Sequence, residues 1–259
     1  MTAIICSAKS GSDWTTNDLR AYNVNVVNED IATFFGIDHL PPPPVRQAIL
    51  TNLDYPANGL PDREDRLFFD YMHYAMLTPP GEESAVDDFA ARILSMLRYD
   101  EPDRVIRLRK NIPLFTCGSE MHAKTDVCVM DWRSGIILLV QEDKRYLEGG
   151  DPEPQLFAEA VSAFQFHNRR LRLAGQSIIN LKIIPGIIMI GTAPIFYKVN
   201  VTAALVECIE TTQYPAQVTN VHKLVPPIQR PLGLQDEGMR PLDNRAVMLS
   251  CFEAFRQFI

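Results

Sequence analysis

Four charged residues lie at the two ends of an otherwise largely apolar stretch, "TDVCVMDWRSGIILLVQEDKR". Asp126 stands near its start, and Glu142, Asp143 and Lys144 stand near its end. Charge on a buried strand costs free energy unless something compensates it. Carboxylates bind hard divalent cations through oxygen, and a lysine can stabilise charge that develops on a phosphate. The stretch therefore either meets water at both ends or holds an ion and performs chemistry.

The middle of this stretch is predicted to be a β-hairpin. A three-residue loop ending in Gly135 is a common hairpin connection, so we expect Trp132 opposite Ile136. That register sets Asp126 opposite Glu142, with Lys144 on the same face, because opposed residues share a face and side chains alternate along a strand. A register change of one residue would move Asp126 to the other face.

Two carboxylates at close range repel each other unless a cation lies between them. Oxygen ligands suit Mg²⁺ or Mn²⁺, and a bound ion lowers the pKa of its water and polarises a phosphoryl group. Asp126, Glu142 and Lys144 together predict a divalent-metal-dependent site that hydrolyses phosphodiester bonds. The alternative is a structural one, in which an acid and a lysine simply pair across strands at the end of a sheet.

Helical and strand periodicities alternate along the chain. An amphipathic helix is expected over 82–100, where Val86, Phe89 and Ile93 share one face. Further helices are expected at 44–53, 62–77, 151–175, 202–212 and 241–259, and strands at 103–111, 112–118, 181–193 and 195–201. This order predicts an α/β or α+β protein in a single domain, 1–259. Its core would span about 82–200, with helical additions at 1–81 and 201–259.

With these elements in place, the pattern TD-x15-EDK resembles the core motif of the PD-(D/E)XK nuclease superfamily. The resemblance implies a restriction-endonuclease-like core: helix, three antiparallel strands, helix and strand, with a mixed central sheet flanked by helices. The chain follows that order over about 82–192. The resemblance also implies that Asp126 and Glu142 bind the metal with help from the backbone carbonyl of Asp143, and that Lys144 is the catalytic lysine.

Two further site residues follow from the same resemblance. Gln155, on the next helix, matches a glutamine that RecB-like nucleases direct at their site. An acid on the first core helix is also typical. Of the candidates Glu82, Glu83, Asp87 and Asp88, we take Glu83 as a metal ligand. The chain departs from the pattern at two positions, because Thr125 replaces the proline before the aspartate and Glu159 stands where RecB-like proteins carry an aromatic residue.

The net charge of −7 argues against a protein that coats nucleic acid tightly. It does not exclude an enzyme that contacts DNA or RNA locally, which is the predicted partner. The basic stretches 104–110 and 167–173 are interpreted as solvated faces. Two other hypotheses stay open: a catalytically inactive PD-(D/E)XK-like domain that acts as a protein or nucleic-acid interaction module, and an unrelated α+β domain.

The cysteines and apolar runs bear on the expected compartment. There are five cysteines, an odd number without a CxxC pair, so we expect free thiols in a reducing compartment. No run of 18 apolar residues occurs, and no signal peptide is predicted. These features favour an intracellular protein, in the cytoplasm or nucleus, without a membrane partner.

Overall fold

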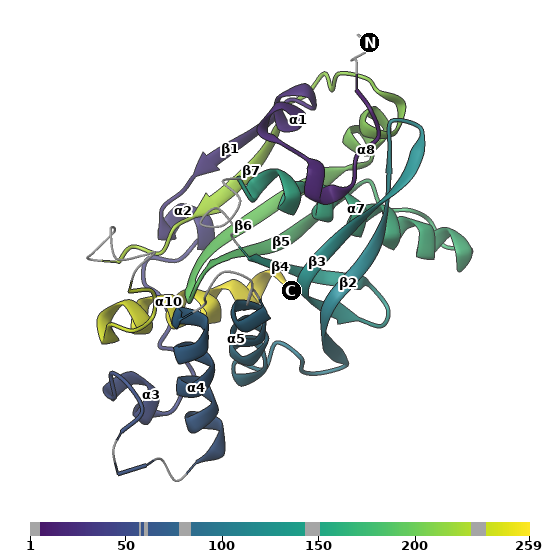
Figure 1. The fold of residues 1–259 in the computed structure, drawn as a ribbon. Coiled ribbons are helices and arrows are strands. Elements are labelled where there is room, and N and C mark those ends of the chain that lie inside the picture. The colour runs from purple at the N-terminus through teal and green to yellow at the C-terminus, as the bar shows by residue number, and fades with distance from the viewer. Residues whose placement is uncertain (1–5, 57, 60–61, 78–83, 143–150, 229–236) are drawn as a thin grey trace.

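The computed structural model describes residues 6–56, 58–59, 62–77, 84–142, 151–228 and 237–259. Its centre is a seven-stranded mixed sheet in the order β1-β7-β6-β5-β4-β3-β2 (Figure 1). The strands are β1 (Val24–Asn28), β2 (Arg104–Thr116), β3 (Ser119–Asp131), β4 (Gly135–Glu142), β5 (Leu181–Ile190), β6 (Ala193–Thr202) and β7 (Thr219–Leu224).

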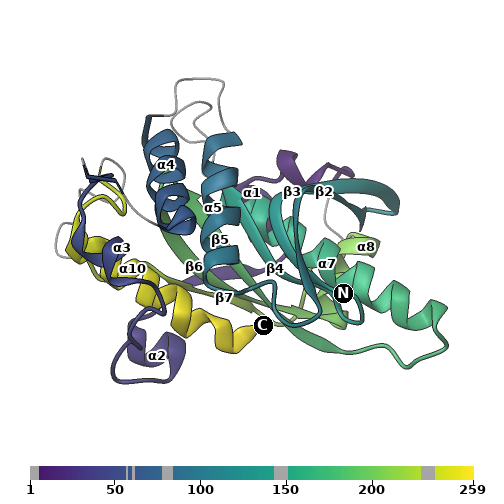
Figure 2. The same cartoon turned by 90° about the horizontal axis from the view of Figure 1, so that it is seen from below.

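Helices cover both faces of this sheet. They are α1 (Thr16–Ala21), α2 (Ile31–Phe35), α3 (Gln47–Thr51), α4 (Arg63–Leu77), α5 (Ser84–Met96), α7 (Glu153–Leu173), α8 (Ala203–Thr211) and α10 (Leu242–Phe255), with the short 3-10 helices η1 (Gly11–Asp13) and η2 (Arg256–Phe258). One apolar core joins α4, α5 and α10 to the sheet, and a second joins α1, α7 and α8 to its other face. Figure 2 shows α4 and α5 on one side of the strands and α7 and α8 on the other.

Local chemistry explains where the main helices begin and how closely they pack. The carboxylate of Asp62 accepts a hydrogen bond from the backbone N–H of Glu64 at 2.8 Å and so caps the start of α4. Helix α7 packs closely on β5. A Cβ atom added at Gly186 would stand only 2.9 Å from Leu156 Cδ1. Only glycine lets helix and strand approach this closely.

The order of the central elements agrees with the prediction. Helix α5, the antiparallel strands β2, β3 and β4, helix α7 and strand β5 follow one another in the chain, and β4 and β5 pair in parallel. The prediction of two separate strands over 103–118 is wrong, since β2 runs through both. The mixed sheet flanked by helices is confirmed.

The prediction of purely helical additions at the two ends is wrong, because both additions also contain a strand. The N-terminal addition contributes β1, which pairs in parallel with β7 from the C-terminal addition (Val24 with Thr219). Strand β1 has five residues and no strict alternation of buried and exposed side chains. Its sequence signal is therefore weak, and its pairing depends on a segment almost 200 positions away. Among the described helices, none is long and apolar enough to cross a membrane.

Candidate metal site around Asp126

The turn of the β3–β4 hairpin has three residues, as predicted, but it lies one residue earlier than predicted. Asp131 pairs with Gly135, so the loop spans 132–134. The Oδ1 atom of Asp131 accepts hydrogen bonds from the backbone N–H groups of Arg133 at 2.8 Å and Ser134 at 2.6 Å. The hydroxyl of Ser134 donates to the same atom at 2.8 Å. This side-chain cap fixes where the turn begins.

A bulge in β4 then moves the register a second time. Ile137 is an extra residue between two consecutive hairpin pairs. Continuing the pairs beyond the bulge sets Asp126 opposite Gln141. The predicted pairing of Asp126 with Glu142 is wrong by one residue, because the earlier turn shifts the register by two positions and the bulge restores only one.

Asp126 lies at a point in β3 where the side chains that had faced one side of the sheet begin to face the other, and the neighbouring strand β2 is distorted at the same level. In β3, Ala123 packs in the core on the α7 side and Val127 in the core on the α5 side. Residues four apart would otherwise share a face. In β2, the position opposite Asp126 is Arg109, whose φ is +51°. Positive φ is uncommon outside glycine, and such backbone outliers cluster at functional sites.

Helix α7 brings two polar residues to this kink. The Nε2 of Gln155 donates a hydrogen bond to Oε1 of Glu159 at 3.2 Å. Glu159 is completely buried. Burial raises the pKa of Glu159 well above the ordinary value, and the charge of Asp126 raises it further, while the hydrogen bond from Gln155 opposes both effects. The protonated form of Glu159 is therefore favoured beside Asp126.

Two buried side-chain oxygens near Asp126 have no hydrogen-bond partner within the described part of the chain. They are Oε1 of Gln141, a residue that is 3 % exposed, and Oε2 of Glu159. Buried polar atoms are normally partnered, and each one left alone costs free energy. Oxygen donors of this kind suit Mg²⁺ or Mn²⁺. The residues here thus fit a divalent cation in donor type.

Several predicted site residues fall outside what the structure describes. Asp143, Lys144 and Glu83 lie outside the described residues. Glu142 ends β4 opposite Met189 of β5, and its side chain is also outside the description. Within the described residues, no group of three or more His, Cys, Asp or Glu side chains is arranged to hold a metal ion. A site at Asp126 would need further ligands from Glu142 and the segment that follows it, or from substrate and water.

The first core helix carries one buried acid, although it differs from our choice. Asp87 on α5 is 8 % exposed, whereas its neighbour Asp88 is exposed. Glu159 and Gln141 are the residues that sequence reasoning did not assign to the site. The spacing of Gln155 and Glu159, one helical turn apart, was the available signal for Glu159.

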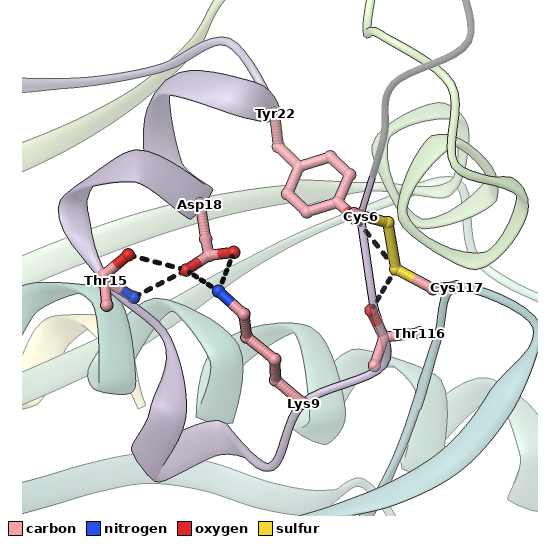
Figure 3. A network of polar contacts seen from close by, with 7 residues as sticks. All are labelled: Cys6, Lys9, Thr15, Asp18, Tyr22, Thr116 and Cys117. Atoms are coloured by element: carbon pink, nitrogen blue, oxygen red, sulfur yellow. Dashed lines mark hydrogen bonds and ion pairs between the residues drawn. A yellow bond between two sulfur atoms is a disulfide. The ribbon is translucent and has the colours of Figure 1, made fainter.

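A segment from the N-terminus packs beside this site. A disulfide joins Cys6 to Cys117 (Figure 3), which corrects the expectation of five free thiols, while Cys128, Cys208 and Cys251 are free and buried. Lys9 binds Asp18 at 2.8 Å. Burial acts to raise the pKa of Asp18, but hydrogen bonds from Lys9 and Thr15 lower it overall. We call residues 6–14 the N-terminal strap.

The strap reaches β3 and α7 close to Asp126 and Glu159. A Cβ atom at Gly11 would lie 2.8 Å from the Cβ of Ala123 in β3 and 3.7 Å from that of Ala158 in α7. Glycine is therefore required for this approach. Trp14, at the end of the strap, is 5 % exposed and lies 6.1 Å from the ring of Phe157. The strap thus covers the N-terminal half of α7.

No protein-family model matches the chain, and a comparison with curated proteins also gives no match.

Proposed function

We propose that this chain is a divalent-metal-dependent nuclease that hydrolyses phosphodiester bonds of DNA or RNA, built on a restriction-endonuclease-like core. One observation carries the proposal. Asp126, at a kink shared by two strands, lies close enough to the buried Glu159 of α7 to raise its pKa, Gln155 hydrogen-bonds Glu159, and two buried oxygens of Glu159 and Gln141 have no partner among the described residues. The order of helix, three antiparallel strands, helix and strand supports it.

The roles of the residues follow from their chemistry. Asp126 would hold Mg²⁺ or Mn²⁺ together with oxygens from Gln141, Glu159 and the Asp143 carbonyl. Glu142, which the register does not set opposite Asp126, would join them from the end of β4. When bound, such an ion activates water and polarises a phosphoryl group. Gln155 keeps Glu159 in position through its hydrogen bond. Lys144 would stabilise the negative charge that develops on the phosphate.

Metal binding is tested by thermal unfolding of the full chain with millimolar Mn²⁺ or Mg²⁺. A ligand that binds only the folded state stabilises it by about 2.7 kcal/mol at a hundredfold excess over Kd. We expect a higher melting temperature for the wild type and no increase for Asp126→Asn. Asp88→Asn, which removes an exposed acid on α5, should keep the increase. No increase for the wild type would refute the metal site.

Cleavage is tested with single- and double-stranded DNA and RNA in the presence of Mg²⁺ or Mn²⁺. We expect Asp126→Asn to reduce the rate on the order of 10²-fold or more, and Lys144→Ala to reduce it comparably. If Lys144→Ala cleaves as well as the wild type, the lysine has no part in the mechanism.

A second candidate function is favoured by the register of the hairpin. Because Asp126 stands opposite Gln141 and not Glu142, the two acids of the motif are not cross-strand partners. A catalytically inactive domain with the same core, acting as an interaction module, would need no such pairing. Mn²⁺ stabilisation that depends on Asp126, together with cleavage, would exclude this second candidate.

A further inference from the structure

The backbone of the turn 132–134 is held by several hydrogen bonds, and the side chains of Trp132 and Arg133 are exposed. Besides the Asp131 cap, the guanidinium of Arg170 donates a hydrogen bond to the carbonyl oxygen of Trp132. His167 Nδ1 lies 2.6 Å from the carbonyl oxygen of Ser134, and Lys182 Nζ lies 3.5 Å from the same atom. The fixed backbone presents an indole that is 64 % exposed. Its ring lies 4.8 Å from the guanidinium of Arg133.

Cations lie on the strand and the helix next to this turn. Along β2, Arg107 and Lys110 stand opposite Cys128 and Thr125 of β3, and Arg104 stands opposite Asp131 on the other face of the strand. Helix α7 carries Arg169, Arg170 and Arg172, of which Arg170 contacts the turn. Within the described residues, none of these six cations forms an ion pair with a carboxylate. In a chain of net charge −7, this is a locally cationic surface.

An aromatic side chain connects the two rows of cations. The ring of Phe166 lies 5.9 Å from Lys110 Nζ and 5.9 Å from the Arg170 guanidinium. It also lines a cleft of about 390 Å³ between β2 and α7, in which Arg169 and Arg172 take part. Glu120 and Glu210 lie in the same cleft. The most uniformly cationic part is therefore the turn and the adjoining half of β2.

We propose that this surface binds a single strand of nucleic acid, with a base stacked on Trp132 and phosphates held by Arg107 and Arg133. A base can stack on an exposed indole only when its own face is free, which favours a single strand over a duplex. Positive charge complements the phosphates. Charges that only protect an edge strand from aggregation would lie on β2 alone and would not require a rigid, exposed tryptophan on the turn.

This surface lies about 20 Å from Asp126, since six strand residues at roughly 3.3 Å each separate Asp126 from Trp132. A strand bound at the turn could therefore extend along β2 to the candidate metal site. The idea that this surface anchors the substrate of the metal site rests on the proposed function. The idea that the surface binds a single strand does not depend on the proposed function.

The chain has two tryptophans, Trp14 and Trp132, so Trp14→Phe leaves Trp132 as the only indole. We would titrate this variant with oligo-dT and oligo-U of 20 nucleotides at 50 mM salt with EDTA, which prevents cleavage. Saturable quenching of Trp132 fluorescence is expected. Because Trp14 is buried, anisotropy of a labelled oligonucleotide with the otherwise unaltered chain provides a second measurement that does not depend on this variant.

Substitutions then separate stacking from charge. Trp132→Ala should weaken binding about 5- to 150-fold, from the usual contribution of base stacking. Arg107→Ala and Arg133→Ala should each weaken it and lower the slope of log K against log salt by about 0.7. Arg20→Ala, which removes an exposed arginine from α1, should change neither.

Three results would overturn the proposal: no binding of single strands, equal affinity in Trp132→Ala and the wild type, or equal quenching by poly-glutamate. Binding in EDTA without any Mn²⁺ stabilisation would refute the metal site and leave this surface intact. Mn²⁺ stabilisation without binding of single strands would refute the surface and support the metal site. Failure of the surface can therefore be told apart from failure of the metal site.

Discussion

The two tryptophans lie in two regions that differ in how their polar groups are hydrogen-bonded. Trp132 sits exposed on a turn whose backbone carbonyls at 132 and 134 accept hydrogen bonds from charged or titratable side chains. Trp14 is buried against the half of α7 that carries Gln155 and Glu159. In that second region, the Asp126 region, two buried oxygens have no partner among the described residues.

This difference separates two kinds of functional surface. A rigid turn with exposed cationic and aromatic side chains is organised before a ligand arrives, so binding costs little conformational entropy. Buried carboxyl and amide groups without partners are costly unless an ion or a substrate satisfies them. The turn is therefore suited to recognition, and the Asp126 region is suited to chemistry.

The largest effect is expected from releasing the N-terminal strap, which packs beside the Asp126 region. Cys117→Ser removes a link between residues 111 positions apart, and should lower the free energy of unfolding by about 3–5 kcal/mol. Urea unfolding measures this loss. Emission of Trp14 should shift to longer wavelength as the strap loosens, while Trp132 should not change.

A reducing agent provides the control. It should destabilise the wild type as the variant is destabilised, and should have no further effect on Cys117→Ser, because the remaining thiols are already free. Equal stability of the reduced and oxidised wild type would mean that the strap is held by packing and not by the disulfide.

A smaller effect is expected at the turn. Asp131→Ala removes the acceptor for two backbone N–H groups and one hydroxyl, and should cost about 1–2 kcal/mol. Asp131→Asn retains an acceptor oxygen and should lose less. The anisotropy of Trp132 in the Trp14→Phe background should fall in the alanine variant. If it does not fall, the cap does not make the turn rigid.

The turn also has a pH signature. Backbone N–H of Ser134 hydrogen-bonds the Asp131 carboxylate and lowers the pKa of this residue, even though the small burial opposes it. A lowered pKa in the folded state gives stability that is present above the unfolded value, about 3.9, and is lost as the pH falls through the folded value. Wild type and Asp131→Ala should therefore become more similar in stability below pH 4.

The sequence predicted those features of the hairpin that local chemistry determines. A three-residue loop between apolar runs was readable, as was the helix that follows it. The register could not be predicted from the sequence. It depends on whether the turn begins after Asp131 or after Trp132, and on a bulge at Ile137 that forms within the packed sheet. One aspartate cap and one bulge thus decide which residue faces Asp126.

The buried state of Glu159 was not readable for a related reason. Gln155 and Glu159 read as a polar stripe on a helix, yet β3, β4 and the strap enclose that stripe on the α7 side. Burial is a property of the assembled layers, and it turns an ordinary surface pattern into a candidate site. The same holds for β1, which pairs only with β7 among the described strands, whereas β7 pairs with both β1 and β6.

The most discriminating change is Glu159→Gln. Burial raises the pKa of Glu159 above the ordinary value of 4.5, so its stabilising contribution is complete below pH 4.5 and is lost as the pH rises through the folded value. Glutamine cannot ionise and escapes this loss. The variant should be close to the wild type in stability at pH 4, because glutamine has nearly the shape of the protonated glutamic acid. At pH 8 it should be more stable, by about 1.4 kcal/mol for each unit by which folding raises the pKa.

Urea unfolding at both pH values measures the difference, and Glu207→Gln, at an exposed position on α8, serves as the matched control substitution. A variant whose stability relative to wild type falls with rising pH would show that Glu159 is ionised and well partnered in the folded chain. The Asp126 region would then satisfy its polar groups as fully as the turn does, and the contrast between the two regions would disappear. A gain that grows with pH would instead mean that this region gives up stability at neutral pH, as expected where buried carboxyl groups are kept for binding an ion.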